Sequence, residues 1–127
     1  MAPYDRKQPV DPNIIAALAK LPKEMKNNEG RVVRIRERAG RETGFEHIAK
    51  TGHGLQVRDI KRIPSILLKP DAVRKDPVHS VFNKHYYGKK YRNNKLIGYI
   101  KIVTTKNKDG SEQILTLFLT SRLKNDE

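Results

Sequence analysis

A turn between two long runs of strand-like residues most constrains the fold of this chain. Residues 107–110 read Asn-Lys-Asp-Gly, and Asp-Gly tolerates the positive φ angles that tight hairpins need. The flanking runs, residues 96–106 and 112–121, alternate in polarity with the period of a strand. The pattern therefore predicts an antiparallel hairpin. We expect a further strand at residues 78–87 to precede it, joined by a basic loop at 89–95.

The first half of the chain is typical of helices. Asp11-Pro12 is a helix-start signal, and Ile14, Leu18 and Leu21 follow it with the spacing of one apolar stripe. Thr43 is a candidate cap for a helix that ends at Gly52, and residues 57–68 form a helical stretch that Pro64 divides into two. Residues 32–36 have the composition of a short strand.

Together these elements predict an α+β fold, with helices packed on one face of a four-stranded antiparallel sheet. We expect residues 1–30 to form an N-terminal extension with one helix, at the junction with a larger parent protein, and residues 31–127 to form the domain proper.

Alternation assigns the faces of the last two strands. Ile100 and Ile102, with Leu115, Leu117 and Leu119, should point into the core, leaving a polar face on the other side that carries Tyr99, Lys101, Thr116, Phe118 and Thr120.

Composition narrows the range of functions. The chain has no cysteine, which excludes disulfides, thiolate metal sites and a cysteine nucleophile. No apolar stretch approaches the length of a membrane span, as expected of a soluble chain. The net charge of the 127 residues is +13, and residues 74–108 hold ten Lys and Arg against one acid, Asp76. A polyanion such as RNA or DNA is the favoured partner, with an acidic protein or a membrane surface as alternatives.

The histidines are candidates for proton transfer, because histidine titrates near neutral pH. His47 and His53 flank the end of the helix that closes at Gly52, and each could instead be a structural residue. His85 is either a substrate-binding residue or a solvated strand histidine. We expect Lys89, Lys90 and Arg92 to clamp the nucleic-acid backbone, and Tyr99, Phe118 and Ser121 to contact the substrate. No cluster of metal ligands is visible, so no metal and no other cofactor is predicted.

Several motifs follow one another in a familiar order. Glu46-His47-Ile48 and Gly52-His53 precede Ile63-Pro64 and Pro70-Asp71, and a lysine-bearing strand and a Thr-x-Phe-x-Thr-Ser strand follow. This order resembles the phage and polymorphic-toxin branch of the barnase–EndoU–colicin E5/D–RelE superfamily, over residues 31–122. The resemblance implies a two-layer fold and a metal-independent endoribonuclease, favouring tRNA. It also implies action in the bacterial cytoplasm, after delivery as the C-terminal part of an exported toxin, and an acidic immunity or antitoxin partner.

The resemblance also assigns roles to residues. The first family histidine corresponds to His47 and the second to His53, the strand lysine to Lys101, and the terminal hydroxyl to Thr116, Thr120 or Ser121. The expected reaction is attack of the ribose 2′-OH on phosphorus, with His47 as base, Lys101 stabilising the added negative charge and His53 or another group protonating the leaving oxygen. Two alternatives remain open. The chain could be a non-catalytic RNA- or DNA-binding module, or an adaptor that docks an acidic protein.

Overall fold

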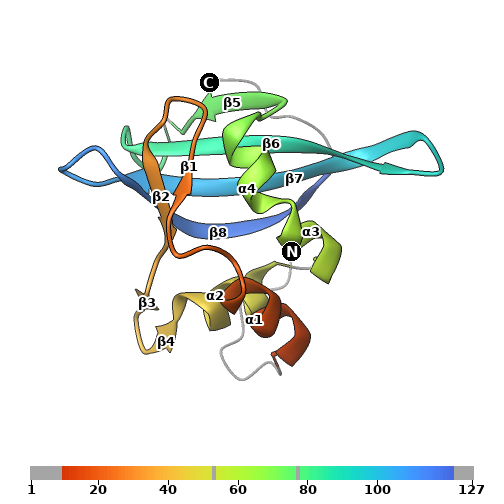
Figure 1. Ribbon diagram of the computed structural model, residues 1–127, viewed down its shortest axis with the longest axis horizontal. Helices are drawn as coiled ribbons and strands as arrows, with labels where there is room; N and C mark the ends of the chain where they lie inside the picture. Colours follow the sequence, from red (N-terminus) through yellow and green to blue (C-terminus); the bar gives the residue numbers. More distant parts are fainter. Residues whose placement is uncertain (1–9, 53, 77, 122–127) are drawn as a thin grey trace.

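The computed structural model describes residues 10–52, 54–76 and 78–121, which form an α+β domain (Figure 1). The helices are α1 (Pro12–Ala19), α2 (Gly44–Thr51), α3 (Val57–Lys61) and α4 (Ile63–Leu68). The strands are β1 (Met25–Lys26), β2 (Val32–Ile35), β3 (Arg38–Ala39), β4 (Glu42–Thr43), β5 (Ala72–Lys75), β6 (Asn83–Arg92), β7 (Lys95–Lys106) and β8 (Glu112–Thr120). The predicted fold class is therefore confirmed.

The prediction of a four-stranded antiparallel sheet is wrong. The main sheet has six strands in the order β1-β2-β8-β7-β6-β5, and β2 pairs with β8 in parallel, with Val33 opposite Glu112. The other neighbours in this sheet are antiparallel, and β3 and β4 form a separate small hairpin. The sheet is mixed because the chain leaves β2, passes through α2 to α4 and the β5–β7 meander, and then places β8 beside β2.

The predicted strand at 78–87 and the loop at 89–95 also differ from the structure. The region around residues 78–82 is a turn, in which the Asp76 carboxylate accepts hydrogen bonds from the backbone N–H groups of Val78 and His79. The strand β6 begins at Asn83 and continues to Arg92, through most of the expected loop. Asn93 and Asn94 both have positive φ and close the β6–β7 hairpin in two residues.

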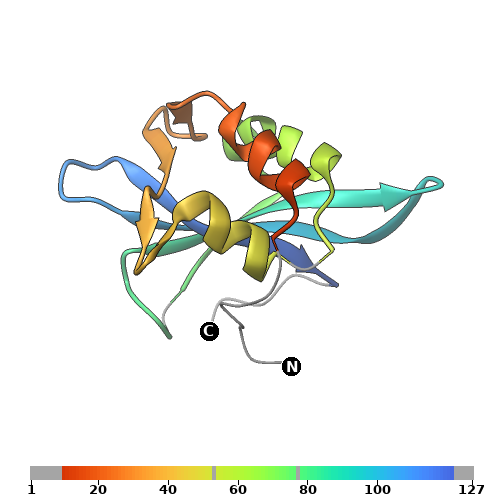
Figure 2. The ribbon, with the colours of Figure 1, turned by 90° about the horizontal axis from the view of Figure 1, so that it is seen from below.

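Helices lie on one face of the main sheet (Figure 2). Residues along β6 alternate between its faces. Tyr86 belongs to the core under the helices, and a Cβ on Gly88 would lie 2.6 Å from the Ile66 side chain of α4. Glycine at position 88 therefore lets α4 approach the sheet closely, so the alternate residues of β6 point away from α4.

The two helix starts predicted from local sequence are confirmed. The Asp11 side chain accepts a hydrogen bond from the Asn13 backbone N–H, and Thr43 and Glu46 form a reciprocal capping box at the start of α2. The α1 residues Ile14 and Leu18 pack into the same hydrophobic core as the sheet. The N-terminal residues that the structure describes are thus part of the domain's core.

A bulge changes the predicted faces of β8. Val103 lies opposite Thr116, but Thr104 lies opposite Ile114, so Leu115 is an extra residue on β8. Ile114 is fully buried in the core and Leu115 is only half-buried. The prediction that Leu115 points into the core is therefore wrong, while Leu117 is buried there as predicted and Leu119 packs against it. Thr116, Phe118 and Thr120 share the opposite face, because the alternation is regular after the bulge.

A buried carboxylate joins four strands or their connections under the helices. Glu112 on β8 is 1% exposed and accepts hydrogen bonds from the Tyr86 hydroxyl at 2.6 Å and the Thr104 hydroxyl at 2.8 Å. The Asn27 amide and the Lys84 ammonium each donate to its other oxygen at 3.1 Å. Burial raises the pKa of Tyr86 to about 12, and its hydrogen bond to Glu112 acts in the same direction. The carboxylate is thus compensated by four donors, as a buried charge requires.

Candidate active site

Most of the residues predicted to act on a substrate lie on the sheet face opposite α1, α3 and α4, which the described helices touch only at its edge. Period-2 alternation places His85, Tyr87 and Lys89 of β6 on this face, whereas Tyr86 and Lys90 point to the helices. Cross-strand pairing adds residues from the neighbouring strands, since paired residues project to the same side of a sheet. We call this surface the open face because no described helix packs over its centre, although Tyr87 and Lys101 at that centre are buried. Its members are Arg74, His85, Tyr87, Lys89, Tyr99, Lys101, Thr116, Phe118 and Thr120.

Lys101 lies at the centre of the open face between two aromatic rings. Its Nζ is 5.2 Å from the centroid of the Phe118 ring and 5.8 Å from that of Tyr87, the residues opposite it on β8 and β6. The Tyr99 ring meets the Tyr87 ring edge-on, with centroids 6.2 Å apart. Lys101 is 6% exposed. A cation held in an aromatic, poorly hydrated environment attracts an anion more strongly than one in bulk water.

His85 lies beside this cluster and is held by a carboxylate. Its Nε2 is 3.0 Å from Oδ2 of Asp76, and its ring meets Tyr87 with centroids 6.5 Å apart. Burial and the nearby Lys101 ammonium lower the pKa of His85, and these effects outweigh the opposing influence of Asp76. The side chain of His85 is 13% exposed. The imidazole is therefore favoured in its neutral form, which can accept a proton.

Helix α2 brings His47 to the edge of the same face. Its neighbour one turn later, Thr51, forms a 2.8 Å hydroxyl–hydroxyl hydrogen bond with Thr116 on β8. The close approach requires Gly52, since a Cβ there would lie 2.9 Å from the Leu117 carbonyl oxygen. Residues four apart on a helix share a side, so His47 and Thr51 project together.

The His47 ring is fixed by a partner on β4. Its Nδ1 is 3.0 Å from Oε1 of Glu42, and the other oxygen of that carboxylate accepts a hydrogen bond from Lys50 Nζ at 3.0 Å. The His47 side chain is 22% exposed, so it remains accessible. A histidine oriented by a carboxylate and still reachable from solvent has the geometry that proton transfer needs.

Not every residue predicted for the site lies on the open face. Lys90 is buried on the helix side, where its Nζ forms an ion pair with Asp59 of α3 at 2.9 Å, so its predicted role in a phosphate clamp is wrong. Arg92 is exposed at the end of the β6–β7 hairpin, and Ser121 is exposed just after β8. His53 lies outside the described residues.

Sequence reasoning missed three residues of this region. Tyr87 follows His85 by two and would have been found by extending the alternation through the whole of β6. Asp76 precedes a turn, and only its contact with His85 reveals a role. Glu42 stands five residues before His47, and the short β3–β4 hairpin brings it back to the helix.

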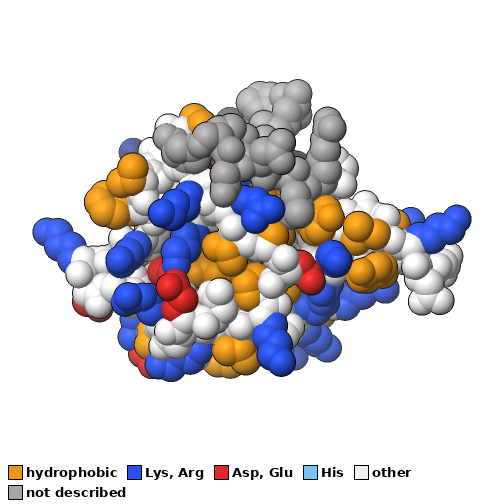
Figure 3. Space-filling view, turned by 90° about the horizontal axis from the view of Figure 1, so that it is seen from above, with side chains coloured by type: hydrophobic (Ala, Val, Ile, Leu, Met, Phe, Trp, Pro, Cys, Tyr) orange, Lys and Arg blue, Asp and Glu red, His pale blue; other side chains and the backbone are white. Residues whose placement is uncertain are grey.

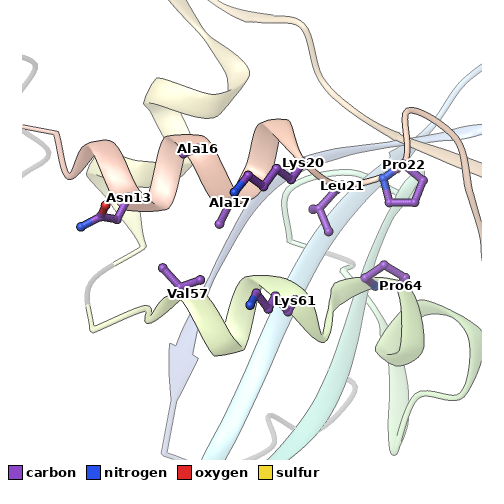
Figure 4. Close-up of a pocket in the computed structure, with 9 residues that line it drawn as sticks. All are labelled: Asn13, Ala16, Ala17, Lys20, Leu21, Pro22, Val57, Lys61 and Pro64. Carbon is purple, nitrogen blue, oxygen red and sulfur yellow. The ribbon is translucent and has the colours of Figure 1, made fainter.

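A groove of about 560 Å³ lies elsewhere, between α1 and the α3–α4 pair (Figure 4). Its walls are mainly apolar, with Lys20 and Lys61 as the charged residues, and none of the predicted site residues lines it. Cations also lie outside the open face and the groove. On the side seen from above in Figure 3, Lys and Arg side chains are more frequent than Asp and Glu side chains. The groove supplies no acid–base pair, so the open face remains the candidate site.

Comparisons with protein-family models, with curated proteins and with solved structures find no match to this chain. The resemblance to the toxin ribonuclease superfamily therefore stays a prediction from the motifs. Among the described residues, no helix has the length and apolar character needed to cross a membrane.

Proposed function

We propose that this chain is a metal-independent endoribonuclease that cleaves RNA, with tRNA as the favoured target, by transesterification on the open face. The observation that carries the proposal is the Lys101 ammonium between the Tyr87 and Phe118 rings, next to a carboxylate-bonded histidine. The formal net charge of +13 favours a polyanionic substrate.

The chemistry follows from what each group can do. A neutral histidine takes the proton of the ribose 2′-OH, and the 2′-oxygen attacks phosphorus. Lys101 stabilises the negative charge that develops on the phosphoryl oxygens. A second group donates a proton to the 5′-oxygen as the P–O5′ bond breaks. The products are a 2′,3′-cyclic phosphate and a 5′-hydroxyl. His85 on the open face and His47 at its edge are the candidates for these two steps.

The substrate can be held without sequence-specific contacts. Tyr99 offers a half-exposed ring on which a base can stack, and Lys89 and Arg74 are cations of the same face. These features would equally serve a module that binds RNA and does not cut it. An assay of cleavage rather than of binding must therefore separate the two functions.

The test is cleavage of total tRNA in the presence of EDTA, comparing the wild-type chain with Lys101→Met and Lys61→Met. Methionine keeps the unbranched shape and most of the length of the side chain and removes the charge. Lys61 is an exposed lysine on α3, away from the open face, and serves as the matched control. We expect Lys101→Met to slow cleavage about 10²–10³-fold, the usual cost of losing an oxyanion stabiliser, and Lys61→Met to change it less than about threefold.

Three results would contradict the proposal. RNA binding without cleavage by the wild-type chain would favour the binding module, and absence of RNA affinity would favour an adaptor for an acidic protein. Cleavage that EDTA abolishes and Mg²⁺ restores would indicate a metal-dependent reaction. Mass analysis of the products, which should carry a cyclic phosphate, distinguishes transesterification from direct hydrolysis.

A further inference from the structure

Asp76 binds more donors than a turn residue needs. Its carboxylate accepts the backbone N–H groups of Val78 and His79, which are enough to close the turn. It also contacts the His79 ring at 2.9 Å and the His85 ring at 3.0 Å, although its own side chain is only 6% exposed. The contact with His85 links this buried carboxylate to the open face.

The contact determines which nitrogen of His85 carries the proton. A carboxylate can only accept, so the neutral imidazole holds its hydrogen on Nε2 and keeps the lone pair on Nδ1. The ring is further fixed by Tyr87 on the same strand and lies opposite Arg74 on β5 and Val103 on β7. One tautomer and one orientation are therefore selected before any substrate binds.

The charged surroundings of His85 come from three elements. Asp76 and His79 face it from the turn before β6, Arg74 from β5 and Lys101 from β7. Burial raises the pKa of Asp76, but the side-chain and backbone hydrogen bonds of His79 and the hydrogen bond of His85 outweigh this and lower it. The carboxylate thus stays ionised, and Lys101 opposes protonation of the ring at rest.

We propose that His85, positioned by Asp76, is the general base of the reaction. This inference rests on the proposed function and assigns His47 to the other proton transfer. Nδ1 of His85 takes the 2′-OH proton as the O2′–P bond forms, and Asp76 stabilises the imidazolium that results. The P–O5′ bond breaks, and the 5′-oxygen receives a proton from His47. One proton is taken and one is returned, so the step balances.

The two histidines can be separated by the leaving group. A ribonucleoside 3′-aryl phosphate loses an aryl oxide that needs no protonation, whereas a dinucleotide loses a 5′-alkoxide that does. Loss of the base must slow both substrates, while loss of the acid slows only the dinucleotide. The variants are His85→Gln and His47→Gln, with Lys61→Met as the control, since Lys61 is exposed on α3 and lies away from the open face.

We expect His85→Gln to slow both substrates about 10²–10⁴-fold and to abolish the rise of rate with pH. His47→Gln should slow the dinucleotide far more than the aryl ester, and Lys61→Met should stay within about threefold of wild type. Asp76→Asn should move the rising limb to lower pH, because it removes an interaction that favours the imidazolium. A merely structural Asp76 would change the melting temperature and leave the position of that limb unchanged.

One further measurement uses the wild-type chain, so its result does not depend on whether a variant folds. Nitrogen NMR of His85 should show the Nε2–H tautomer, with a pKa lowered from the ordinary value for histidine by burial and by the nearby Lys101 ammonium. The Nδ1–H tautomer, or wild-type rates on both substrates in a folded His85→Gln, would overturn the assignment while leaving the ribonuclease proposal intact. Loss of dinucleotide cleavage alone would make His85 the acid and also overturn it. Absence of cleavage by the wild-type chain would overturn the proposed function, and with it the roles given to His85 and His47.

Discussion

Replacing Tyr86 by phenylalanine tests the buried network around Glu112. The change removes one hydroxyl and keeps the ring that packs in the core. That hydroxyl donates to Glu112 at 2.6 Å and accepts from Asn27 at 3.1 Å. The Thr104 hydroxyl still reaches the same carboxylate oxygen, and Asn27 still reaches the other, so neither group becomes unpaired. The loss is that of one hydrogen bond to a charged group, about 1.5–3 kcal/mol.

The corresponding shift in melting temperature is about 6–12 °C, since an unfolding entropy of about 2.1 cal/mol/K per residue gives roughly 4 °C per kcal/mol for this chain. The difference in unfolding free energy between wild type and Tyr86→Phe should also depend on pH. The folded-state pKa of Tyr86 is raised to about 12 from an ordinary value of 10.0, so its contribution is fully present below pH 10. It is lost as the pH rises through 12, and the gap between wild type and Tyr86→Phe should narrow over that range.

Urea unfolding at pH 7.5, 9 and 11 measures both effects. Tyr91→Phe is the matched control, because Tyr91 is 57% exposed and its substitution should change the unfolding free energy by less than about 0.5 kcal/mol. A Tyr86→Phe variant as stable as the control at pH 7.5 would refute the role given to the network. A gap that stays constant up to pH 11 would refute the pKa argument alone.

Three further predictions follow from contacts described above. Lys90→Met should cost about 3–5 kcal/mol in urea unfolding by leaving Asp59 as a buried unpaired charge, and Lys90→Met/Asp59→Leu should recover much of it; a single variant of wild-type stability would contradict the burial of this pair. Gly88→Ala should cost about 1–3 kcal/mol, because the new methyl group overlaps the α4 side chain above it; a neutral effect would show that α4 can move away. Replacing Lys89 and Arg92 by glutamine should flatten the dependence of log affinity for RNA on log salt by up to about two, one for each phosphate contact; an unchanged slope would mean that neither cation touches phosphate.

Local signals in the sequence predicted local structure well. Asp11 and Thr43 cap the helices they were expected to cap, because capping depends on residues within one turn. Asp109-Gly110 closes the β7–β8 hairpin for the same reason, with Gly110 at positive φ. The parallel pairing of Val33 with Glu112 could not be predicted, since it joins segments far apart in the chain and no turn sequence records it. The four-residue β5 is too short for a recognisable alternation.

The same distinction applies to the candidate site. Tyr99, Lys101 and Phe118 were placed on one face by strand period alone, and the structure brings them together. Residues 89–92 have the composition of a basic loop, so the sequence does not indicate that strand alternation continues through them and turns Lys90 to the helix side. Asp76 reaches His85 only through a turn that its own carboxylate stabilises, and a pattern of spacing in the sequence does not contain that contact.

The position of β8 between β2 and β7 has a consequence for how the chain acquires its structure. The last strand fills the middle of the sheet, so the earlier strands cannot close into a continuous sheet until residues 112–120 have been synthesised. Before that moment β2 and β7 each expose an unpaired edge, and Lys101 lacks the Phe118 ring. Chains truncated before β8 should therefore aggregate or be degraded, and the folding rate should be limited by long-range pairing. An incompletely made chain would also lack the assembled open face.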